Sequence, residues 1–252
     1  MTDQNFPLLS IITVVYNAEY LLKETIESVR IQKKDWIEYI VIDGNSKDNT
    51  CKIAKEYERF IDVFISENDS GIYDAMNKGV LVSKGSYISF LNAGDLLVAN
   101  FSDLVKNELD LKRDVISFGI NLKLLNGKLI PIMPEKFEKS NFNPQHMYLP
   151  HPGLLVKKTL FDEIGLFNIN YKSSGDLEWI NRMLTSLNLT IAYVKKPLVI
   201  FLEGGVSQSI KAYSESKNVA VIYGKSKVVS NWIFIKQILK FWLDHFFKSK
   251  KS

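Results

Sequence analysis

Residues 66–97 read SENDSGIYDAMNKGVLVSKGSYISFLNAGDLL, and this stretch decides the fold class of the chain. An acidic turn leads into a short helical pattern, a glycine break follows, and the segment 86–91 (SYISFL) runs out into Asn92-Ala93-Gly94-Asp95. Because this segment is aromatic, β-branched and uncharged, we predict a strand in the middle of a sheet. Ligands of open α/β sheets bind at the carboxyl ends of the strands. We therefore expect Asp95 to lie at a ligand-binding edge.

Strand and helix patterns alternate on the N-terminal side of this stretch. The predicted elements are a buried strand at 8–15, a helix at 19–32, a strand at 37–42, a helix at 48–60 and a weaker strand at 61–65. Nearly continuous apolar runs indicate strands that are buried on both faces, and apolar residues at helical spacing indicate the crossovers. We therefore predict an α/β fold with a mixed, mostly parallel sheet flanked by helices.

The patterns after residue 97 are less regular. Asn126-Gly127 indicates a turn inside the second of two predicted strands, and five prolines within 131–152 indicate a long surface loop. The predicted elements are strands at 115–118, 121–132, 154–156 and 190–201, and helices at 158–164, ending at Gly165, and 175–187. The segment 203–207 is expected to be a loop that caps a following helix. We find no repeat and no clear linker, so one domain is expected over 1–224 with a tail at 225–252.

Composition narrows the class of protein. Cys51 is the only cysteine, which excludes an internal disulfide and suits a reducing compartment. The first residues do not resemble a signal peptide, and no apolar run approaches the roughly 20 residues that span a bilayer. The tail 225–252 carries seven lysines and one acid, which leaves the rest of the chain with a net charge of −2. A body without net positive charge argues against a nucleic-acid-binding protein.

The segment 228–247 is expected to form an amphipathic helix. Its apolar arc contains Trp232, Ile235, Leu239, Trp242 and Phe246, and a narrow polar stripe contains Lys236, Lys240, Asp244 and Lys248. Tryptophans and lysines on one helix suit a membrane interface, where apolar burial and anionic lipids act together. The alternatives are a helix that packs on the body of the protein or on a second subunit of a homo-oligomer.

Three aspartates, Asp43, Asp69 and Asp95, come at or after the ends of predicted strands. Neither of the familiar glycine-rich phosphate-binding motifs occurs, so a bound nucleoside diphosphate would need another source of positive charge. A divalent cation held by carboxylates supplies that charge. Aspartates are also common in turns and helix caps, which is the alternative for each one alone.

Four motifs in order resemble a family 2 glycosyltransferase of the GT-A fold. They are SIITVVYNAEYLLKETIESV, VIDGNSKDNT, DSGIYDAMNKG and FLNAGD, and the similarity extends over about residues 8–207. The closest subgroup resembled makes bacterial surface polysaccharides of the colanic-acid type. The resemblance implies a nucleotide-binding part at about 8–97 and an acceptor part at about 98–224.

The resemblance also implies roles for single residues. Nucleotide-sugar contacts fall on Thr13, Tyr16, Asn17, Asp43, Asp69, Asp74, Asn77 and Asn92. Asp95 corresponds to the metal ligand that bridges both donor phosphates, with Mg²⁺ or Mn²⁺ as the cofactor. Asp176 corresponds to the catalytic base of inverting members. His151 and the loop with Gly204, Gly205 and Ser207 correspond to the region that closes over donor and acceptor.

Two departures from the family pattern concern the acids. Gly44 follows Asp43 where a second acid is often found, and Asn92-Ala93-Gly94-Asp95 keeps one carboxylate. A single protein carboxylate is still compatible with Mg²⁺, which retains several waters. This predicts weak metal binding in the absence of the donor.

The predicted reaction needs a carboxylate that deprotonates the attacking hydroxyl from the side opposite the diphosphate. Asp176 is separated from Asp95 by a long loop and could flank the sugar from that side, although an acid here also suits the first turn of a helix. His151 could equally be a loop histidine that bonds to backbone.

The predicted function is transfer of a sugar from a nucleotide-sugar, with UDP expected as the nucleotide, to a glycan or lipid-linked glycan. The expected location is the cytoplasm, peripheral at the inner face of the bacterial plasma membrane. The alternatives are a catalytically silent scaffold of the same fold and a sugar nucleotidyltransferase.

Overall fold

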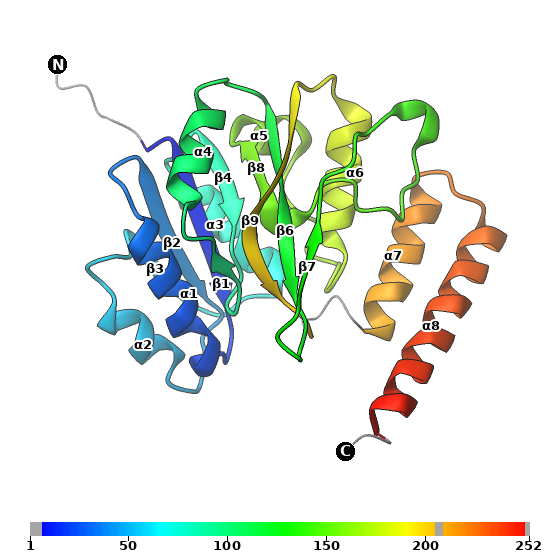
Figure 1. Ribbon diagram of the computed structural model, residues 1–252, viewed down its shortest axis with the longest axis horizontal. Helices are drawn as coiled ribbons and strands as arrows, with labels where there is room; N and C mark the ends of the chain where they lie inside the picture. Colours follow the sequence, from blue (N-terminus) through cyan, green and yellow to red (C-terminus); the bar gives the residue numbers. More distant parts are fainter. Residues whose placement is uncertain (1–6, 205–208, 250–252) are drawn as a thin grey trace.

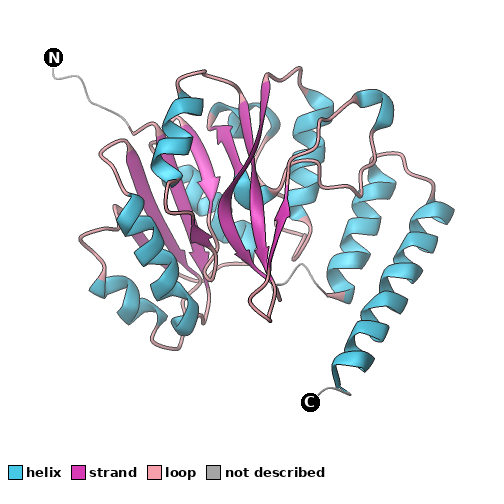
Figure 2. Cartoon of the chain, in the orientation of Figure 1, coloured by secondary structure: helices cyan, strands magenta, loops and turns pink. Residues whose placement is uncertain are grey.

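The computed structural model describes residues 7–204 and 209–249, with side chains through residue 239. Nine strands form one sheet in the order β3-β2-β1-β4-β8-β6-β9-β5, and β7 pairs with β6 outside that path. Helices cover both faces of this sheet, and two further helices stand at one end of the molecule (Figure 1). Figure 2 shows the resulting three layers of helix, sheet and helix. The predicted α/β fold class is confirmed.

The first half alternates as predicted. Its elements are β1 (Leu9–Val15), α1 (Glu19–Gln32), β2 (Ile37–Asp43), α2 (Thr50–Glu56), β3 (Val63–Ser66), α3 (Ile72–Val82) and β4 (Tyr87–Phe90). Strand β1 lies between β2 and β4 and is parallel to both, with Leu9 opposite Ile37 on one side and opposite Tyr87 on the other. All seven residues of β1 are buried, as a strand covered on both faces requires.

The second half adds antiparallel strands to this sheet. Its elements are β5 (Leu96–Leu97), α4 (Phe101–Leu109), β6 (Val115–Lys123), β7 (Leu129–Ile132), β8 (Leu154–Lys157), α5 (Thr159–Ile164), α6 (Gly175–Ser186), β9 (Ile191–Leu202), α7 (Ile210–Ile222) and α8 (Lys227–Ser249). Strand β8 is antiparallel to both β4 and β6, whereas β9 is parallel to β6. The sheet is therefore mixed, and the carboxyl ends of β1, β2, β4, β6 and β9 share its lower edge in Figure 1.

Two apolar cores lie on the two faces of the sheet. Helices α1, α2 and α4 enclose the first core, which includes Leu22, Ala54 and Phe101. Helices α3, α5 and α6 enclose the second core, which includes Met76 and Trp179. The aromatic residues of the second core stack closely, with the rings of Phe161 and Trp179 4.5 Å apart.

Several predicted boundaries are wrong. The helix expected over 48–60 is limited to α2, because residues 57–60 form a turn in which the Tyr57 amide bonds to the Ala54 carbonyl. The two strands expected at 115–118 and 121–132 are a continuous β6 and a separate β7 joined at the predicted Asn126-Gly127 turn. The structure also contains helix α4 and strand β5, which the sequence analysis did not predict.

The proline-containing segment after β7 is only partly a surface loop. Tyr148 and Leu149 are buried in the second core, and Phe137 and Phe142 pack against that core. The predicted capping of the next helix by 203–207 is also wrong, since the Ser209 side chain accepts the Ala212 amide at 3.1 Å at the start of α7. Residues 205–207 lie outside the described residues.

Helix α8 begins at Lys227 and packs along α7. On its first half, Val228, Trp232, Ile235 and Leu239 are each more than half exposed. Within the described part of the chain, no helix combines the length and apolar character that crossing a membrane requires.

The close contact between the start of β1 and Gly85 gives a stability prediction. A β-carbon at Gly85 would lie 2.4 Å from the Ser10 amide nitrogen, and the Gly85 amide itself donates to the Ser10 hydroxyl at 2.8 Å. Gly85→Ala should therefore lower the free energy of unfolding by about 2 kcal/mol or more through overpacking against backbone. Denaturant unfolding monitored by circular dichroism measures this.

The matched control is Gly127→Asn. A β-carbon there meets nothing within 4 Å, and asparagine tolerates its positive φ of 82°. The control should lose about 1 kcal/mol or less. Equal losses in both variants would contradict the packing argument.

Candidate functional site

The candidate site lies at the edge where the parallel strands β1, β2 and β4 end. Tyr16 follows β1 and is 60% exposed, which leaves its ring free for stacking. Asn17 adopts a positive φ of 47°, and its side-chain oxygen accepts the Lys47 amide at 2.8 Å. The turn after β1 is thus fixed to the turn after β2, and the exposed tyrosine stands beside both.

Asp43 is the last residue of β2 and is completely buried. Its carboxylate accepts hydrogen bonds from the hydroxyls of Ser46 and Ser66, the Cys51 thiol and the Ser46 amide. Burial opposes ionisation, but these donors outweigh it and hold the pKa of the Asp43 carboxyl below its usual range. Asp43 is therefore an anion that organises the turn beneath any ligand at this edge.

Asp69 occupies the space that a second acid after Asp43 would need. A β-carbon at Gly44 would lie 2.4 Å from the Asp69 carboxylate and 3.3 Å from the Tyr16 ring. The Asp69 carboxylate also accepts the Gly71 amide at 2.9 Å. The departure at Gly44 has a physical reason, since Asp69 brings a carboxylate to the same place from another loop.

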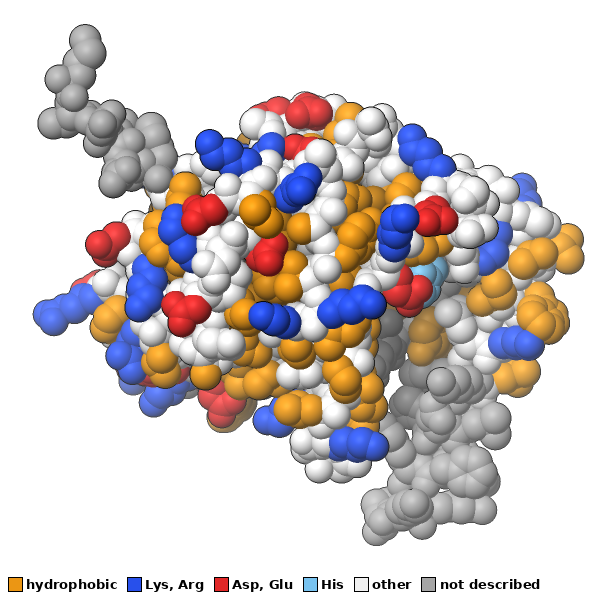
Figure 3. All heavy atoms as spheres, turned by 45° about the horizontal axis from the view of Figure 1, so that its top comes forward, with side chains coloured by type: hydrophobic (Ala, Val, Ile, Leu, Met, Phe, Trp, Pro, Cys, Tyr) orange, Lys and Arg blue, Asp and Glu red, His pale blue; other side chains and the backbone are white. Residues whose placement is uncertain are grey.

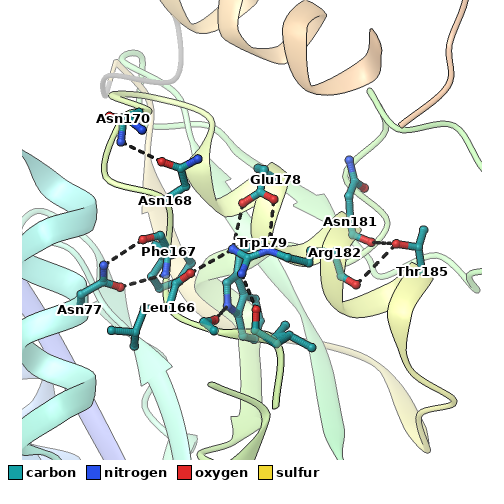
Figure 4. Close-up of polar contacts among 12 residues, drawn as sticks. Asn77, Leu166, Phe167, Asn168, Asn170, Glu178, Trp179, Asn181, Arg182 and Thr185 are labelled. Carbon is teal, nitrogen blue, oxygen red and sulfur yellow. Dashed lines mark hydrogen bonds and ion pairs between the residues drawn. The ribbon is translucent and has the colours of Figure 1, made fainter. Parts of the chain in front are cut away.

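Three predicted contact residues lie below the edge. Thr13 is fully buried, and its hydroxyl accepts the Tyr39 hydroxyl at 3.1 Å. Asn77 uses its amide group to bond both the amide and the carbonyl of Phe167, each at 2.9 Å (Figure 4). Asp74 accepts the Ser70 amide at 2.9 Å and so supports the loop that carries Asp69. These contacts favour supporting roles for all three residues.

Asn92 and Asp95 belong to one turn, in which the Asp95 amide donates to the Asn92 carbonyl at 3.0 Å. One Asp95 oxygen, Oδ1, accepts the Leu202 amide of β9 at 3.1 Å. Within the described part of the chain, neither Asp95 Oδ2 nor Asn92 Oδ1 has a hydrogen-bond partner, and both atoms are buried. Burial therefore raises the pKa of Asp95 to about 7.

Two buried oxygens without donors fit a cation in chemical type. Carboxylate and amide oxygens are ligands of Mg²⁺, and each has acceptor capacity left. Among the described residues, no group of three or more His, Cys, Asp or Glu side chains is placed to hold a metal. Any cation here would therefore depend on a few protein oxygens and on ligands from outside the chain.

Asp176 lies in the first turn of α6, and its Oδ1 accepts the Tyr73 hydroxyl of α3 at 3.0 Å. Burial and the Asp176 charge raise the pKa of the Tyr73 phenol far above its usual range, so Tyr73 stays a donor. Gly175 permits this approach, because a β-carbon there would lie 2.8 Å from the Tyr73 ring. Tyr73 is a site residue that the sequence analysis missed.

His151 is buried between β4 and the second core. Its ring stacks on Phe90 with 5.4 Å between ring centroids. Burial lowers the pKa of His151, and the nearby Asp176 charge opposes that shift in part. The imidazole is therefore favoured in its neutral form, and the charge of Asp176, 25 residues further along the sequence, acts on it.

Glu178 is the other acid of this helix turn, and its side chain is engaged elsewhere. It pairs with Arg182 at 3.0 Å, as Figure 4 shows, and accepts the Tyr223 hydroxyl at 3.2 Å. Arg182 in turn donates to the Leu166 carbonyl at 2.9 Å. This pairing leaves Asp176 as the better placed acid for chemistry.

The closing loop is described only at its start. Gly204 is exposed and has a positive φ of 103°. Gly205 and Ser207 lie outside the described residues. Glu203 at the beginning of the loop accepts the Leu125 amide at 3.0 Å and so connects this loop to the β6–β7 turn.

Comparison with known proteins finds similarity to glycosyltransferases. The family model described as glycosyl transferase family 2 matches residues 10–165. An uncharacterized glycosyltransferase of Rickettsia typhi is 34% identical over 182 residues, which are 68% of this chain and 57% of that protein. A PGL/p-HBAD biosynthesis glycosyltransferase of Mycobacterium bovis is 27% identical over 81% of this chain and 80% of its own length. The chain thus spans little more than half of the first relative.

Solved structures show the same fold. TarS of S. aureus in complex with UDP-GlcNAc aligns with a TM-score of 0.67 and 19% identity over 91% of this chain and 71% of that chain. The mannosyltransferase PcManGT of Pyrobaculum calidifontis, in complex with GDP-Man and Mn²⁺, aligns with a TM-score of 0.63 and 15% identity over 91% and 70%. At these identities the likeness concerns the fold alone.

The raised pKa of Asp95 predicts a pH-dependent stability. The folded state holds the Asp95 proton more tightly than the unfolded chain, so this contribution to stability is present below pH 4 and is lost as the pH rises to about 7. Without ligand, the free energy of unfolding should fall between pH 5 and pH 8 by roughly 1 to 3 kcal/mol more in the wild type than in Asp95→Asn.

Thermal and urea unfolding at the two pH values measure this difference. Asp103→Asn, which changes an exposed aspartate of α4, is the control and should follow the wild type. If the free energy of unfolding depends on pH in the same way in the wild type and in Asp95→Asn, ionisation of Asp95 does not destabilise the folded state and the prediction is wrong.

Proposed function

Because this chain belongs to glycosyl transferase family 2, we propose that it transfers a sugar from a nucleoside diphosphate donor to a glycan or lipid-linked glycan, with inversion at the anomeric carbon. The observation that carries this proposal is the Asp176 carboxylate, held by Tyr73 beside the loop of Asp69. It supplies a base on one side of a sheet edge whose other side carries Asn92 and Asp95. UDP is the proposed nucleotide, by analogy with TarS and its UDP-GlcNAc complex.

The proposed donor site is the edge formed by Tyr16, Asn17, Asp43 and Asp69. Tyr16 presents an exposed ring to the nucleobase, and Asp69 presents a carboxylate to hydroxyl groups. Asp43 holds the turn of residues 44–46 beneath them. A bound divalent cation would be held by Asp95 and Asn92 with the donor phosphates, and it would neutralise charge on the departing diphosphate.

Asp176 is proposed as the base. It accepts the proton of the acceptor hydroxyl while the acceptor oxygen forms a bond to the anomeric carbon. The bond from that carbon to the diphosphate breaks, and the nucleoside diphosphate leaves with the electron pair. Tyr73 keeps its proton and bonds to Asp176 Oδ1, which fixes the carboxyl orientation and leaves Oδ2 for the acceptor. His151 closes the site behind Asp176 with a ring that is neutral.

A silent binding protein of the same fold is the second candidate. The observation that favours it is the thin acidic motif, since Asp95 is the one carboxylate of its turn and is enclosed. A glycosyltransferase would turn over a nucleotide-sugar, whereas a silent binding protein would bind the nucleotide without turnover. We find no glycine-rich basic segment after β1 that would support a nucleotidyltransferase.

Helix α8 is proposed to hold the enzyme at an anionic membrane surface, where a lipid-linked acceptor would be found. The helix also carries Lys227 and Lys236, and the Lys236 ammonium lies 3.5 Å from the centroid of the Trp232 ring. Figure 3 shows hydrophobic and lysine side chains together at this end of the molecule. Apolar residues and cations on one helix match the chemistry of an anionic bilayer.

The base assignment predicts a large loss of turnover in Asp176→Asn. With a panel of UDP- and GDP-sugars, Mg²⁺ or Mn²⁺ and lipid-linked glycans, kcat should fall about 10²- to 10⁴-fold while KM for the donor changes little. Glu178→Gln, two residues along α6, is the control and should keep turnover within about tenfold, because it removes the charge of the ion pair with Arg182 and leaves Asp176 in place. Turnover is measured from release of the nucleoside diphosphate.

Two results would contradict the proposed enzyme. Full turnover in Asp176→Asn would remove this residue from catalysis. Absence of transfer by the wild type with every donor, although a nucleotide binds in calorimetry, would support the silent binding protein.

The membrane proposal predicts that Trp232→Gln/Leu239→Gln weakens binding to phosphatidylglycerol-containing vesicles about tenfold or more, since two exposed apolar side chains are lost. Deletion of residues 225–252 should shift the protein from the membrane to the soluble fraction. Vesicle co-sedimentation measures both effects, and wild-type binding should weaken with salt.

Leu81→Gln is the matched control, because Leu81 is also more than half exposed but lies on α3. It should bind vesicles like the wild type. Two results would contradict the membrane role. One is that the deletion variant partitions like the wild type, and the other is that the substitutions abolish dimers and leave vesicle binding unchanged.

A further inference from the structure

Three successive backbone amides before α6 converge on one carboxylate. The Lys172 amide donates to both oxygens of Glu215 at 3.0 Å, and the amides of Ser173 and Ser174 donate to Oε2 at 2.8 and 3.1 Å. Glu215 belongs to α7, more than 40 residues further along the chain. A carboxylate that accepts several amides in this way is bound by charge-assisted hydrogen bonds.

These amides belong to the segment that positions Asp176. Ser174 is the N-cap of α6, and its side chain makes no capping hydrogen bond. Its hydroxyl instead donates to the Ala212 carbonyl of α7 at 3.1 Å. The segment that leads into α6 is therefore held by α7, although the helix itself has no side-chain cap. Asp176 follows two residues after Ser174.

The same segment also contacts the loop that carries Asp69. The Lys172 ammonium donates to the Ser70 carbonyl, and Tyr73 of α3 donates to Asp176 at 3.0 Å. Residues 172–176 are thus held from two sides, by α3 and by α7. Without the contact from α7, three amides would lose their acceptor and the segment would be held from one side only.

We propose that Glu215 is a positioning residue for the transfer reaction: its carboxylate fixes the backbone of residues 172–174 and so sets the placement of Asp176. This rests on the proposed role of Asp176. Glu215 needs no contact with donor or acceptor for this role. The competing explanation is that Glu215 only attaches α7 to the body, in which case its loss would lower stability and leave the turnover of the folded enzyme unchanged.

The test compares Glu215→Gln and Glu215→Ala with the wild type. Glutamine keeps the shape of the side chain and one acceptor oxygen, whereas alanine removes both oxygens. We expect kcat to fall about tenfold in the first variant and about a hundredfold in the second, with KM for the donor within about twofold, because misplacing a catalytic group affects turnover. Glu163→Gln, an exposed glutamate of α5, should match the wild type.

Added formate or acetate gives a readout that general loss of stability would not move. Glu215→Ala leaves three amides directed at an empty space of carboxylate size, so tens of millimolar formate should restore several-fold of its kcat. Glu163→Gln should not respond. Unchanged kcat in folded Glu215→Ala, a loss confined to KM, or no response to either anion would overturn the proposal.

Hydrogen–deuterium exchange separates this inference from the proposed function. The amides of Lys172, Ser173 and Ser174 should exchange at least about tenfold faster in Glu215→Gln than in the wild type, while the amides of α3 keep their rates. Unchanged exchange at 172–174 would overturn the positioning role. If exchange is faster in Glu215→Gln but the wild type transfers no sugar, the role of Glu215 in placing Asp176 stands and the proposed reaction is rejected.

Discussion

The structure depends on β1, a strand that is buried on both faces and paired in parallel on both sides. A continuous apolar strand such as LSIITVV can be accommodated only between two layers of helices. Its parallel neighbours β2 and β4 must then end at the same edge as β1. The polar residues at the ends of these strands therefore lie at that edge. This brings Tyr16, Asp43 and Asn92 together although they are distant in the sequence.

The carboxyl groups near this edge differ in pKa because they accept different numbers of hydrogen bonds. Asp43 is fully buried, yet four hydrogen-bond donors hold its pKa low. Asp95 is buried to a similar degree, but among the described residues it has fewer donors, of which the Leu202 amide is one, and its pKa rises to about 7. Burial alone therefore does not decide the charge of a carboxyl group. The first arrangement suits a fixed structural anion, and the second suits a group that is completed by a cation.

Features encoded by local pattern could be predicted from the sequence, and features that depend on distant pairs could not. The apolar runs of β1 and β2 and the glycine stop at Gly165 are local, and each was placed correctly. The bond between Tyr73 and Asp176 joins residues 103 apart, and that between Ser173 and Glu215 joins residues 42 apart. Neither has a local signature. Gly44 looked like a missing acid for the same reason, since the Asp69 carboxylate that fills its space comes from another loop.

Helix α3 connects the two halves of the site. It reaches Asp176 through Tyr73 and the segment at Phe167 through Asn77, and the loop before it receives the Lys172 ammonium. The helix is itself fixed to the sheet, because Gly79 lets it approach Ile12 of β1 so closely that a β-carbon would lie 2.5 Å from that side chain. Helix α3 thus fixes the position of Asp176 relative to β1, the central strand that also ends at the proposed donor site. A rigid link of this kind fixes the distance between the two sides of the site, while α7 holds the same segment from outside.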